Sequence, residues 1–478
     1  MAEAFKRTLG IPMGDLSQFR KRPVATLAII AVNIAVYAIT TYENLFLEVG
    51  DYWVSTGGFV PALTPMPAQW YRIFSSMFLH ADFFHILFNM YFLYLFGRAV
   101  EEALGSWRFL ALYMVSGVVA SIFHTAFSFI GGATAYVIPA IGASGAISGV
   151  LGAYLILFPG TSLVMGWGFL FFPIFFRMKA AYYLIFWFAT QVIYGYARLG
   201  GSTAVFAHAG GFIAGIALLP LVANKERLIQ FRLARQAAFP TYVVFTPTPT
   251  KTAGLGTTTK VIVAVLLAAL LLGAAYASTG IASQGNAKWV TIQFTCEGTA
   301  YTDSLGVSLS NLESQLASIP LDKTRILMNR LNAAHLLYNI SKVNQELKIF
   351  NWNDELPVNI TVDSFTTTVN VSTTIHYFFG KYDSDGFLSY GNGSLITRAV
   401  KGYISKGILY IIQSDPIAYK FELNSQTMNL AYITQCTGIA SLVATAAALS
   451  VTLKKDRDLA LIGEEPRRVW HPFTPIAQ

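Results

Sequence analysis

Charged residues are scarce in this 478-residue chain, and that scarcity limits what the chain can be. Asp, Glu, Lys and Arg make up 12% of the residues, whereas hydrophobic residues make up 54%. A typical soluble domain carries about 25% charged residues. A soluble fold of this length would have too little polar surface, so we expect a membrane protein that crosses the bilayer several times.

Cysteine is also scarce, because the chain has only Cys296 and Cys436. Two cysteines allow one internal disulfide at most and exclude a cysteine-rich metal site. The net charge of +8 could suggest a nucleic-acid partner, but the basic residues cluster in short segments beside apolar stretches, which is typical of membrane topology. We expect no cleavable signal, since the first apolar stretch follows a basic cluster at 20–22 and is long enough for a membrane helix.

Apolar stretches recur along the chain and predict eight membrane spans. They lie at 24–41, 83–96, 107–129, 144–158, 180–197, 205–223, 261–281 and 433–453. The positions of Lys and Arg beside these spans predict that both termini lie in the cytosol of a cell-membrane protein. A further apolar segment at 163–176 is short and contains Gly and Pro, so it predicts an interfacial cytosolic loop.

Composition divides the chain into six parts. They are a six-helix core (1–223), a cytosolic linker (224–260), a seventh span (261–281), a segment of soluble composition (282–430), an eighth span (431–453) and a cytosolic tail (454–478). The soluble segment has helical spacing at 326–343 and alternation at 358–378 and 407–412, which predicts an extracytoplasmic α+β domain.

The N-glycosylation motif supports this topology. All four Asn-x-Ser/Thr acceptors lie in the segment placed outside, at Asn339, Asn359, Asn370 and Asn392. In the same topology Cys296 lies just outside the seventh span and Cys436 lies at the outer start of the eighth. We therefore predict a disulfide that ties together the two ends of the outer domain.

The tetrapeptide Gly142-Ala143-Ser144-Gly145 opens the fourth span and has two interpretations. Small residues of this kind are typical of packed contacts between membrane helices. A serine between glycines is also a place where a nucleophile has room, because glycine lets the backbone approach a substrate closely. The surrounding ionisable residues decide between these interpretations.

Ionisable residues are costly inside a membrane, so each is a candidate for function. His85 and Asn89 have i, i+4 spacing and share one face of the second span. His208 lies near the outer end of the sixth span. The predicted topology puts all three in the outer part of the membrane, at the depth of Ser144.

This constellation suits acyl transfer. A neutral imidazole can take the proton of a serine hydroxyl, so His208 is the candidate base for Ser144. The side chains of Asn89 and His85 and the backbone N–H of Ser144 could stabilise the oxyanion. The sequence has no carboxylate at this depth, which favours a Ser-His dyad over a triad. It predicts neither a metal nor a cofactor.

Taken in order, these pieces resemble the rhomboid family of intramembrane serine proteases. The matching motifs are Tyr71-Arg72, similar to a Trp-Arg motif; His85 and Asn89; Gly97 to Glu101 with Gly105; Gly142 to Gly145; and His208 with Gly211 and Gly215. The resemblance covers about residues 20–223. It implies Ser144 as nucleophile, His208 as base, the oxyanion donors named above, and substrate entry from the lipid beside the fifth span.

The remaining motif residues have structural interpretations. Gly142, Gly145, Gly211 and Gly215 would allow close backbone approach, Arg72 and Glu101 would hold loops and turns, and His80 and His124 would pack. One position departs from the family: Ser148 stands where some bacterial relatives carry an aromatic residue against the base. Another residue must then orient His208, and the sequence does not identify it.

The sequence therefore predicts an intramembrane serine endopeptidase in the lipid bilayer that cleaves single-span membrane proteins near the outer membrane face. The outer domain would select or bind substrate. The alternative is a catalytically silent relative that binds membrane clients or acts in trafficking, although such relatives usually lack the serine or the histidine. A transporter or channel would need internal repeats and charges at mid-membrane, and the sequence has neither.

Overall fold

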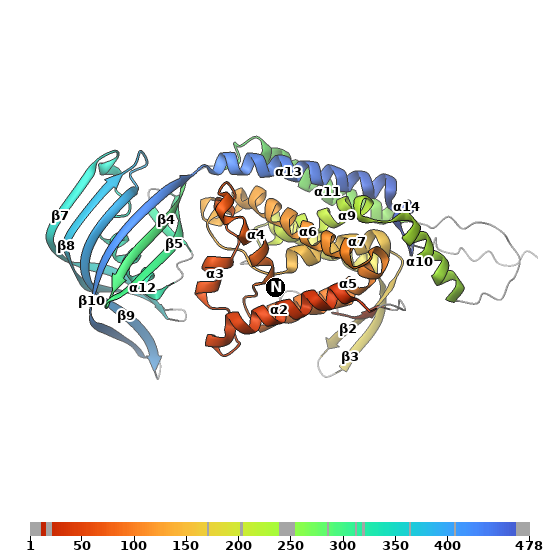
Figure 1. The fold of residues 1–478 in the computed structure, drawn as a ribbon, viewed down its shortest axis with the longest axis horizontal. Helices are drawn as coiled ribbons and strands as arrows, with labels where there is room; N and C mark the ends of the chain where they lie inside the picture. The colour runs from red at the N-terminus through yellow and green to blue at the C-terminus, as the bar shows by residue number, and fades with distance from the viewer. Residues whose placement is uncertain are drawn as a thin grey trace, which may run out of the picture.

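The computed structural model describes residues 11–15, 22–169, 172–200, 204–238, 254–283, 286–310, 313–317, 321–362, 365–405 and 408–464. It consists of a helical bundle with a β-sheet domain at one end (Figure 1). The apolar helices are α2 (Val24–Thr41), α5 (Phe83–Leu104), α6 (Ser106–Phe127), α7 (Ser144–Leu157), α8 (Ala180–Tyr196), α9 (Val205–Val222), α11 (Thr257–Ser278) and α13 (Leu430–Ser450). These elements confirm the predicted multi-pass fold, with six core helices and two further ones.

Six helices in the described part of the chain are long and apolar enough to cross a membrane, namely α2, α5, α6, α9, α11 and α13. Helix α7 has only 14 residues, so at 1.5 Å per residue it is about 21 Å long. A hydrocarbon core is about 30 Å thick. The ends of α7 therefore cannot both reach the membrane surfaces, and its first residue, Ser144, can lie below one of them.

Helix α7 is the centre of the bundle, and every residue from Gly145 to Leu157 is buried. It packs against α9 with almost no space between the two backbones. A Cβ atom on Gly211 would lie 1.9 Å from the carbonyl oxygen of Gly145, and one on Gly215 would lie 1.8 Å from that of Gly149. Any side chain at these two positions would push the helices apart.

Short helices and turns lie in the segments that connect the long helices of the bundle. They are α3 (Asp51–Gly57), α4 (Tyr71–Ser75), α10 (Lys225–Ala238), α14 (Asp456–Leu459), the 3-10 turns η1 (Tyr42–Asn44), η2 (Pro61–Leu63), η3 (Pro67–Gln69), η4 (Ser76–Phe78), η5 (Ser128–Gly131) and η6 (Ala133–Tyr136), and the π turn η8 (Val451–Lys455). Helix α10 lies in the segment interpreted from sequence as a linker. The Arg227 side chain fastens it to the end of α5 by donating to the carbonyl oxygens of Glu102 and Ala103.

The segment expected to be a loop at 163–176 is instead a β-hairpin. Strands β2 (Ser162–Phe169) and β3 (Phe172–Lys179) pair antiparallel, and β1 (Ile11–Asp15) adds to β2. An apolar segment of this length cannot span a membrane as a helix, and as strands its backbone groups bond to one another. The four-residue segment Leu461 to Glu464 also contacts the core, since the N–H groups of Leu461 and Ile462 both donate to the carbonyl oxygen of Leu157 at the end of α7.

The domain between α11 and α13 is a seven-stranded antiparallel sheet in the order β6-β5-β4-β10-β9-β8-β7. Its elements are β4 (Asn286–Cys296), β5 (Thr299–Ser310), β6 (Glu313–Ala317), α12 (Asp322–Ala333), η7 (Ile340–Lys342), β7 (Glu346–Val362), β8 (Phe365–Tyr382), β9 (Leu388–Ser405) and β10 (Ile408–Met428). Buried Leu327, Met328 and Leu331 of α12 pack on one face of the sheet. The predicted α+β composition is therefore confirmed.

The boundaries inside this domain differ from the sequence expectation. The helical pattern at 326–343 becomes α12, which ends at Ala333, followed by η7. The alternating pattern at 358–378 covers parts of two paired strands, β7 and β8, and 407–412 overlaps only the start of the 21-residue strand β10. Alternation continues through a hairpin, so the pattern alone cannot separate two strands from one.

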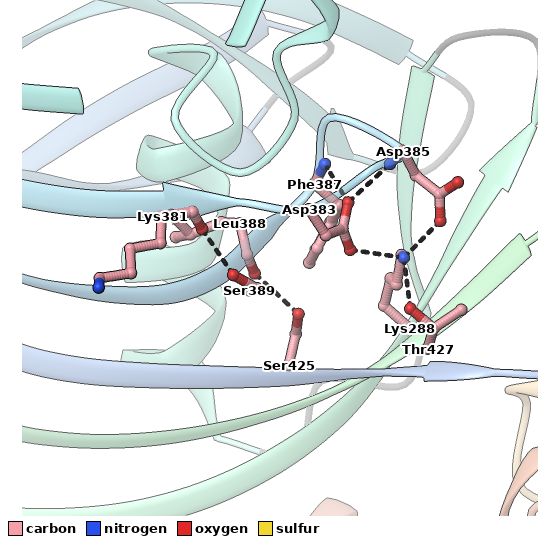
Figure 2. A network of polar contacts seen from close by, with 9 residues as sticks. All are labelled: Lys288, Lys381, Asp383, Asp385, Phe387, Leu388, Ser389, Ser425 and Thr427. Atoms are coloured by element: carbon pink, nitrogen blue, oxygen red, sulfur yellow. Dashed lines mark hydrogen bonds and ion pairs between the residues drawn. The ribbon is translucent and has the colours of Figure 1, made fainter. Parts of the chain in front are cut away.

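A buried charge joins the base of this sheet to the turn between β8 and β9 (Figure 2). The Lys288 side chain is fully buried and its Nζ lies 2.6 Å from a carboxylate oxygen of Asp383 and 2.6 Å from one of Asp385. Its third donor reaches Thr427 Oγ1 at 2.7 Å. All three donors of the ammonium group are satisfied, which is the condition for burying such a charge.

Candidate active site

Ser144 and His208 meet at the N-terminal ends of α7 and α9. Ser144 is the first residue of α7, and the Oγ atom of Ser144 lies 2.7 Å from the Nε2 atom of His208. The close packing of α7 on α9 makes this approach possible. The structure thus brings together the two residues that the sequence selected from separate spans.

Gln191 lies on the far side of the His208 ring, and the sequence analysis missed it. Its Oε1 atom lies 2.9 Å from His208 Nδ1. The amide group of Gln191 also donates from Nε2 to the carbonyl oxygen of Trp187 and to Thr190 Oγ1, which identifies Oε1 as the acceptor facing His208. Nδ1 therefore carries the imidazole proton, and the lone pair of Nε2 faces the serine hydroxyl.

An aromatic ring also lies beside the histidine, but it comes from α8. The Trp187 ring centroid is 6.0 Å from that of His208, at an interplanar angle of 36°. Ser148, which stands where an aromatic residue was expected, instead donates to the carbonyl oxygen of Ser144 at 2.6 Å. Gln191 and Trp187 together hold the ring of His208. Gln191 was detectable in principle, as a polar side chain within an apolar helix.

His85 faces Ser144 from α5. The backbone N–H of Ala81 donates to His85 Nδ1 at 3.2 Å, so in the neutral ring Nε2 carries the proton. That Nε2 atom lies 2.8 Å from the position that a Cβ on Gly142 would occupy, and Ser144 Oγ lies 3.6 Å from the same position. Gly142 has φ +123°, so glycine is needed here both for backbone conformation and for space between the two side chains.

Asn89 lies one turn below His85 and lines the same cavity. Its amide group donates to the carbonyl oxygen of His85 at 2.8 Å, which leaves its second N–H for another acceptor.

His80 supports the loop that precedes Ser144. It is fully buried, its Nδ1 lies 3.3 Å from the carbonyl oxygen of Phe78, and its Nε2 accepts from the N–H of Ala143 at 3.5 Å. Burial, with the nearby His85, lowers the pKa of His80 to about 3, so the ring is neutral and can accept a hydrogen bond. The sequence assigned His80 only to packing.

One cavity of about 1140 Å³ is lined by Ser144, His208, His85, Asn89 and Trp187. Its walls come from α5, α7, α8 and α9 and from the outer loop that leads to Ser144. His124, also expected to pack, lines it as well. The volume lies just above the range of about 300 to 1,000 Å³ that is typical of small-molecule pockets, so a short peptide segment has room beside Ser144 and His85.

Arg72 and Glu101 lie away from the cavity and hold the backbone of the bundle. The Arg72 guanidinium donates to the carbonyl oxygens of Ser55 and Gly58, at 2.5 and 3.1 Å, at the C-terminal end of α3. The Glu101 carboxylate accepts from the first N–H groups of α2, at Ala25 and Thr26, and from the Ser106 hydroxyl, at 2.6 to 2.8 Å. A carboxylate at a helix N-terminus satisfies donors that have no partner within the helix.

The predicted disulfide is wrong. Cys296 and Cys436 are both free, with Cys296 buried and Cys436 exposed. The sequence interpretation placed Cys296 next to the membrane, whereas β4 runs outward from Asn286 and Cys296 is its last residue. Ten residues of strand at about 3.3 Å each separate the thiol from the base of the domain. Its strand neighbour there is Tyr419, not α13.

The comparison with known families fits this geometry. Residues 67–225 match the family model of the rhomboid domain. The chain carries a rhomboid domain. Ser144, His208, His85, Asn89 and Gln191 all lie in the matched region. Helices α11 and α13 and the sheet domain lie outside it.

Curated relatives of the rhomboid domain come from bacteria and eukaryotes. The chain is 30% identical over 138 residues to the mitochondrial Rhomboid protein 1 of Saccharomyces cerevisiae, covering 29% of this chain and 38% of that protein. It is 32% identical over 143 residues to Rhomboid protease AarA of Providencia stuartii (27% and 50%), and 29% identical over 169 residues to Rhomboid-type serine protease 2 of Emericella nidulans (35% and 30%). The chain therefore spans half or less of the length of these relatives.

Proposed function

We propose that this protein is an intramembrane serine endopeptidase. The observation that carries the proposal is the chain of contacts from Ser144 through His208 to Gln191, in a cavity that also contains His85. The match to the rhomboid domain supports it, as do relatives named as a rhomboid protease and a rhomboid-type serine protease.

In the proposed reaction the Ser144 hydroxyl attacks the carbonyl carbon of the scissile peptide bond. His208 Nε2 takes the hydroxyl proton, and Gln191 accepts the Nδ1 hydrogen bond of the imidazolium that results. The negative charge that develops on the peptide oxygen is stabilised by His85 Nε2–H, by the backbone N–H of Ser144 and by Asn89 after its side chain turns. His208 then protonates the leaving amine. A water molecule, deprotonated by His208, releases the acyl group from Ser144.

The proposed substrates are single-span membrane proteins cleaved near the outer membrane face. Their helix must unwind before its carbonyl groups can reach Ser144, and in lipid the freed backbone groups have no partners. The cavity between α5 and α8 would supply such partners. Entry from the lipid beside α8 agrees with the walls of the cavity, because Trp187, Tyr194 and Arg198 of this region line it.

The proposed orientation places the sheet domain outside the cell membrane and both termini in the cytosol. Two of the sequons are well exposed for glycosylation, Asn359 on β7 and Asn370 on β8. Asn339 and Asn392 are only half-exposed, although the side chain of exposed Asn359 is also hydrogen-bonded, since its Oδ1 accepts from Thr368 Oγ1. We propose that glycans attach first to Asn359 and Asn370, and that the sheet domain contributes to the choice of substrates.

The experiment is a cleavage assay on a tagged single-span substrate in the same liposomes as the enzyme. We expect Ser144→Ala and His208→Ala each to lower the cleavage rate by about 10³-fold or more. Ser121→Ala on α6 and His376→Ala on β8 are matched controls away from the cavity, and both should cleave like wild type. Equal cleavage by wild type, Ser144→Ala and His208→Ala would contradict the proposal, and absence of cleavage by wild type would favour a silent client-binding protein.

A further inference from the structure

The sheet domain is not a free appendage, because it packs on the outer loops of the helical bundle. The contact is a cluster of buried apolar residues that is separate from the cores of the two parts. It contains Val60, Ala62, Leu63, Ala133, Tyr136 and Val137 from the core loops, Ala287, Trp289 and Met428 from the sheet, and Leu430 and Ile433 from α13.

The tightest part of this contact is Val137 against Gly306 of β5. A Cβ atom on Gly306 would lie 2.3 Å from Val137 Cβ and 2.8 Å from its Cγ1, so the valine side chain lies directly on the strand backbone. Two residues near Val137 in the chain make polar contacts with the sheet domain and with α13. Thr134 Oγ1 lies 3.0 Å from Ser308 Oγ on β5, and the Tyr136 hydroxyl lies 2.5 Å from Thr434 Oγ1 on α13.

The segment that touches the sheet domain continues into the loop that presents Ser144. Ala140 pairs with Phe59 through two backbone hydrogen bonds, and the N–H of Gly142 donates to the carbonyl oxygen of Ser76 at 2.8 Å. Five residues after Val137 the chain reaches Gly142, a reach of at most about 18 Å. Ala135 and Ile138 line the catalytic cavity within this stretch. One segment, 133–143, therefore contacts the domain at one end and the reaction site at the other.

Strand pairing and buried ion pairs hold the sheet domain together where it makes this contact. Trp289 pairs with Gly306 across β4 and β5. The preceding residue, Lys288, is held by ion pairs with Asp383 and Asp385 (Figure 2). Strand β10 runs directly into α13, which packs along the bundle (Figure 1). A displacement of β5 would therefore be transmitted to segment 133–143 rather than absorbed within the sheet.

We propose that the sheet domain sets the reactivity of Ser144 by holding segment 133–143, with Val137 as the positioning residue. The inference rests on the proposed function, since it concerns the same nucleophile. The inference differs from substrate selection, because it predicts that the sheet domain changes the rate at which Ser144 reacts with a small reagent that does not contact the sheet. Substrate selection alone would leave the reaction with such a reagent unchanged.

The test uses the full-length protein in detergent and a small fluorophosphonate probe that reacts with activated serines. Gly306→Ala puts a methyl group against Val137, and we expect the second-order rate of Ser144 labelling to fall by about fivefold. Thr302→Leu is the matched control, since Thr302 lies on the same strand and is exposed, and its labelling rate should equal that of wild type. Val137→Gly alone, which removes the positioning side chain and its contact with Gly306, should also lower the labelling rate.

Hydrogen exchange on the same samples separates the possible outcomes. Gly306→Ala should speed exchange in segment 133–143 while β4 and β10 stay protected. Faster exchange there with a wild-type labelling rate would overturn the inference. If Gly306→Ala also removes the protection of β4, the deciding variant is Ser308→Ala, which deletes only the bond to Thr134. A twofold lower labelling rate in Ser308→Ala supports the inference, and an unchanged rate overturns it. Absence of labelling in wild type would instead contradict the proposed function.

Discussion

His208 donates from Nδ1 to the side-chain oxygen of Gln191 across 2.9 Å, on the side of the ring opposite Ser144. In the proposed reaction, a neutral side chain would orient the histidine in the way that a carboxylate does in a serine-protease triad. A buried carboxylate among apolar helices would need a charged partner, whereas an amide needs only hydrogen bonds. Gln191 obtains these from Trp187 and Thr190 on its own helix.

Gln191→Leu should lower kcat and leave KM nearly unchanged. The substitution removes the bond that holds the tautomer and the ring of His208, and a hydrogen bond of this kind contributes about 1 to 1.5 kcal/mol, so we expect about a tenfold decrease in kcat. The measurement is steady-state cleavage of the liposomal substrate. Thr190→Val, which removes only a neighbour of the amide, should lose less. Full kcat in Gln191→Leu would show that His208 needs no orienting partner.

Gly215→Val should destabilise the bundle. A Cβ at this position would lie 1.8 Å from the carbonyl oxygen of Gly149, and overpacking of this kind costs about 1 to 3 kcal/mol or more. A thermal unfolding curve in detergent should show a clear decrease in Tm. Ala217→Val on the same helix is the control, because Ala217 is only half-buried. Equal melting temperatures for both variants would contradict the close contact between α7 and α9.

Lys288→Met should loosen the sheet domain without unfolding the helical bundle. The change leaves the carboxylates of Asp383 and Asp385 facing each other without their shared cation, and breaking such a buried pair costs about 3 kcal/mol. Hydrogen exchange of β4 should then be about a hundredfold faster, with α7 and α9 unchanged. Lys381→Met removes an exposed ion pair with Glu346 and should have little effect. A wild-type exchange rate in Lys288→Met would mean that the network adds no stability.

A thiol count tests the corrected cysteine assignment. The denatured, unreduced protein should contain two reactive thiols, since Cys296 and Cys436 are both free. In the folded protein Cys296 should react slowly, because burial raises the pKa of its thiol and the thiolate is the reactive form. Blockage of both cysteines before reduction would contradict the structure and restore the disulfide.

Hydropathy and charge were sufficient to predict the helical part of the fold and the candidate pair of the site. The sequence could assign Ser144 and His208 to the same membrane depth because the predicted topology puts each near the outer end of its span. Basic residues at the opposite ends of the spans indicate that topology. Gln191 could not be assigned in this way. The face of α8 that meets α9 depends on packing, and a lone glutamine in an apolar helix is equally consistent with a contact between helices.

The errors outside the rhomboid domain have a common physical cause. Periodicity identifies strands but does not give their direction or their end. The sequence therefore placed Cys296 at the wrong end of β4 and gave no boundary between β7 and β8 within the alternating pattern at 358–378. The contact between Val137 and Gly306 joins residues that are distant in the chain. Nothing in the local sequence of either residue identifies its partner.

The most direct test of the central claim is to locate the fluorophosphonate adduct by peptide mass spectrometry in wild type and in His208→Ala. We predict a single phosphonylated residue in wild type, Ser144, and labelling slower by about a hundredfold or more when the histidine is absent, since general-base catalysis typically contributes 10²- to 10⁴-fold. An adduct on a different serine, or equally fast labelling of Ser144 without His208, would contradict the account.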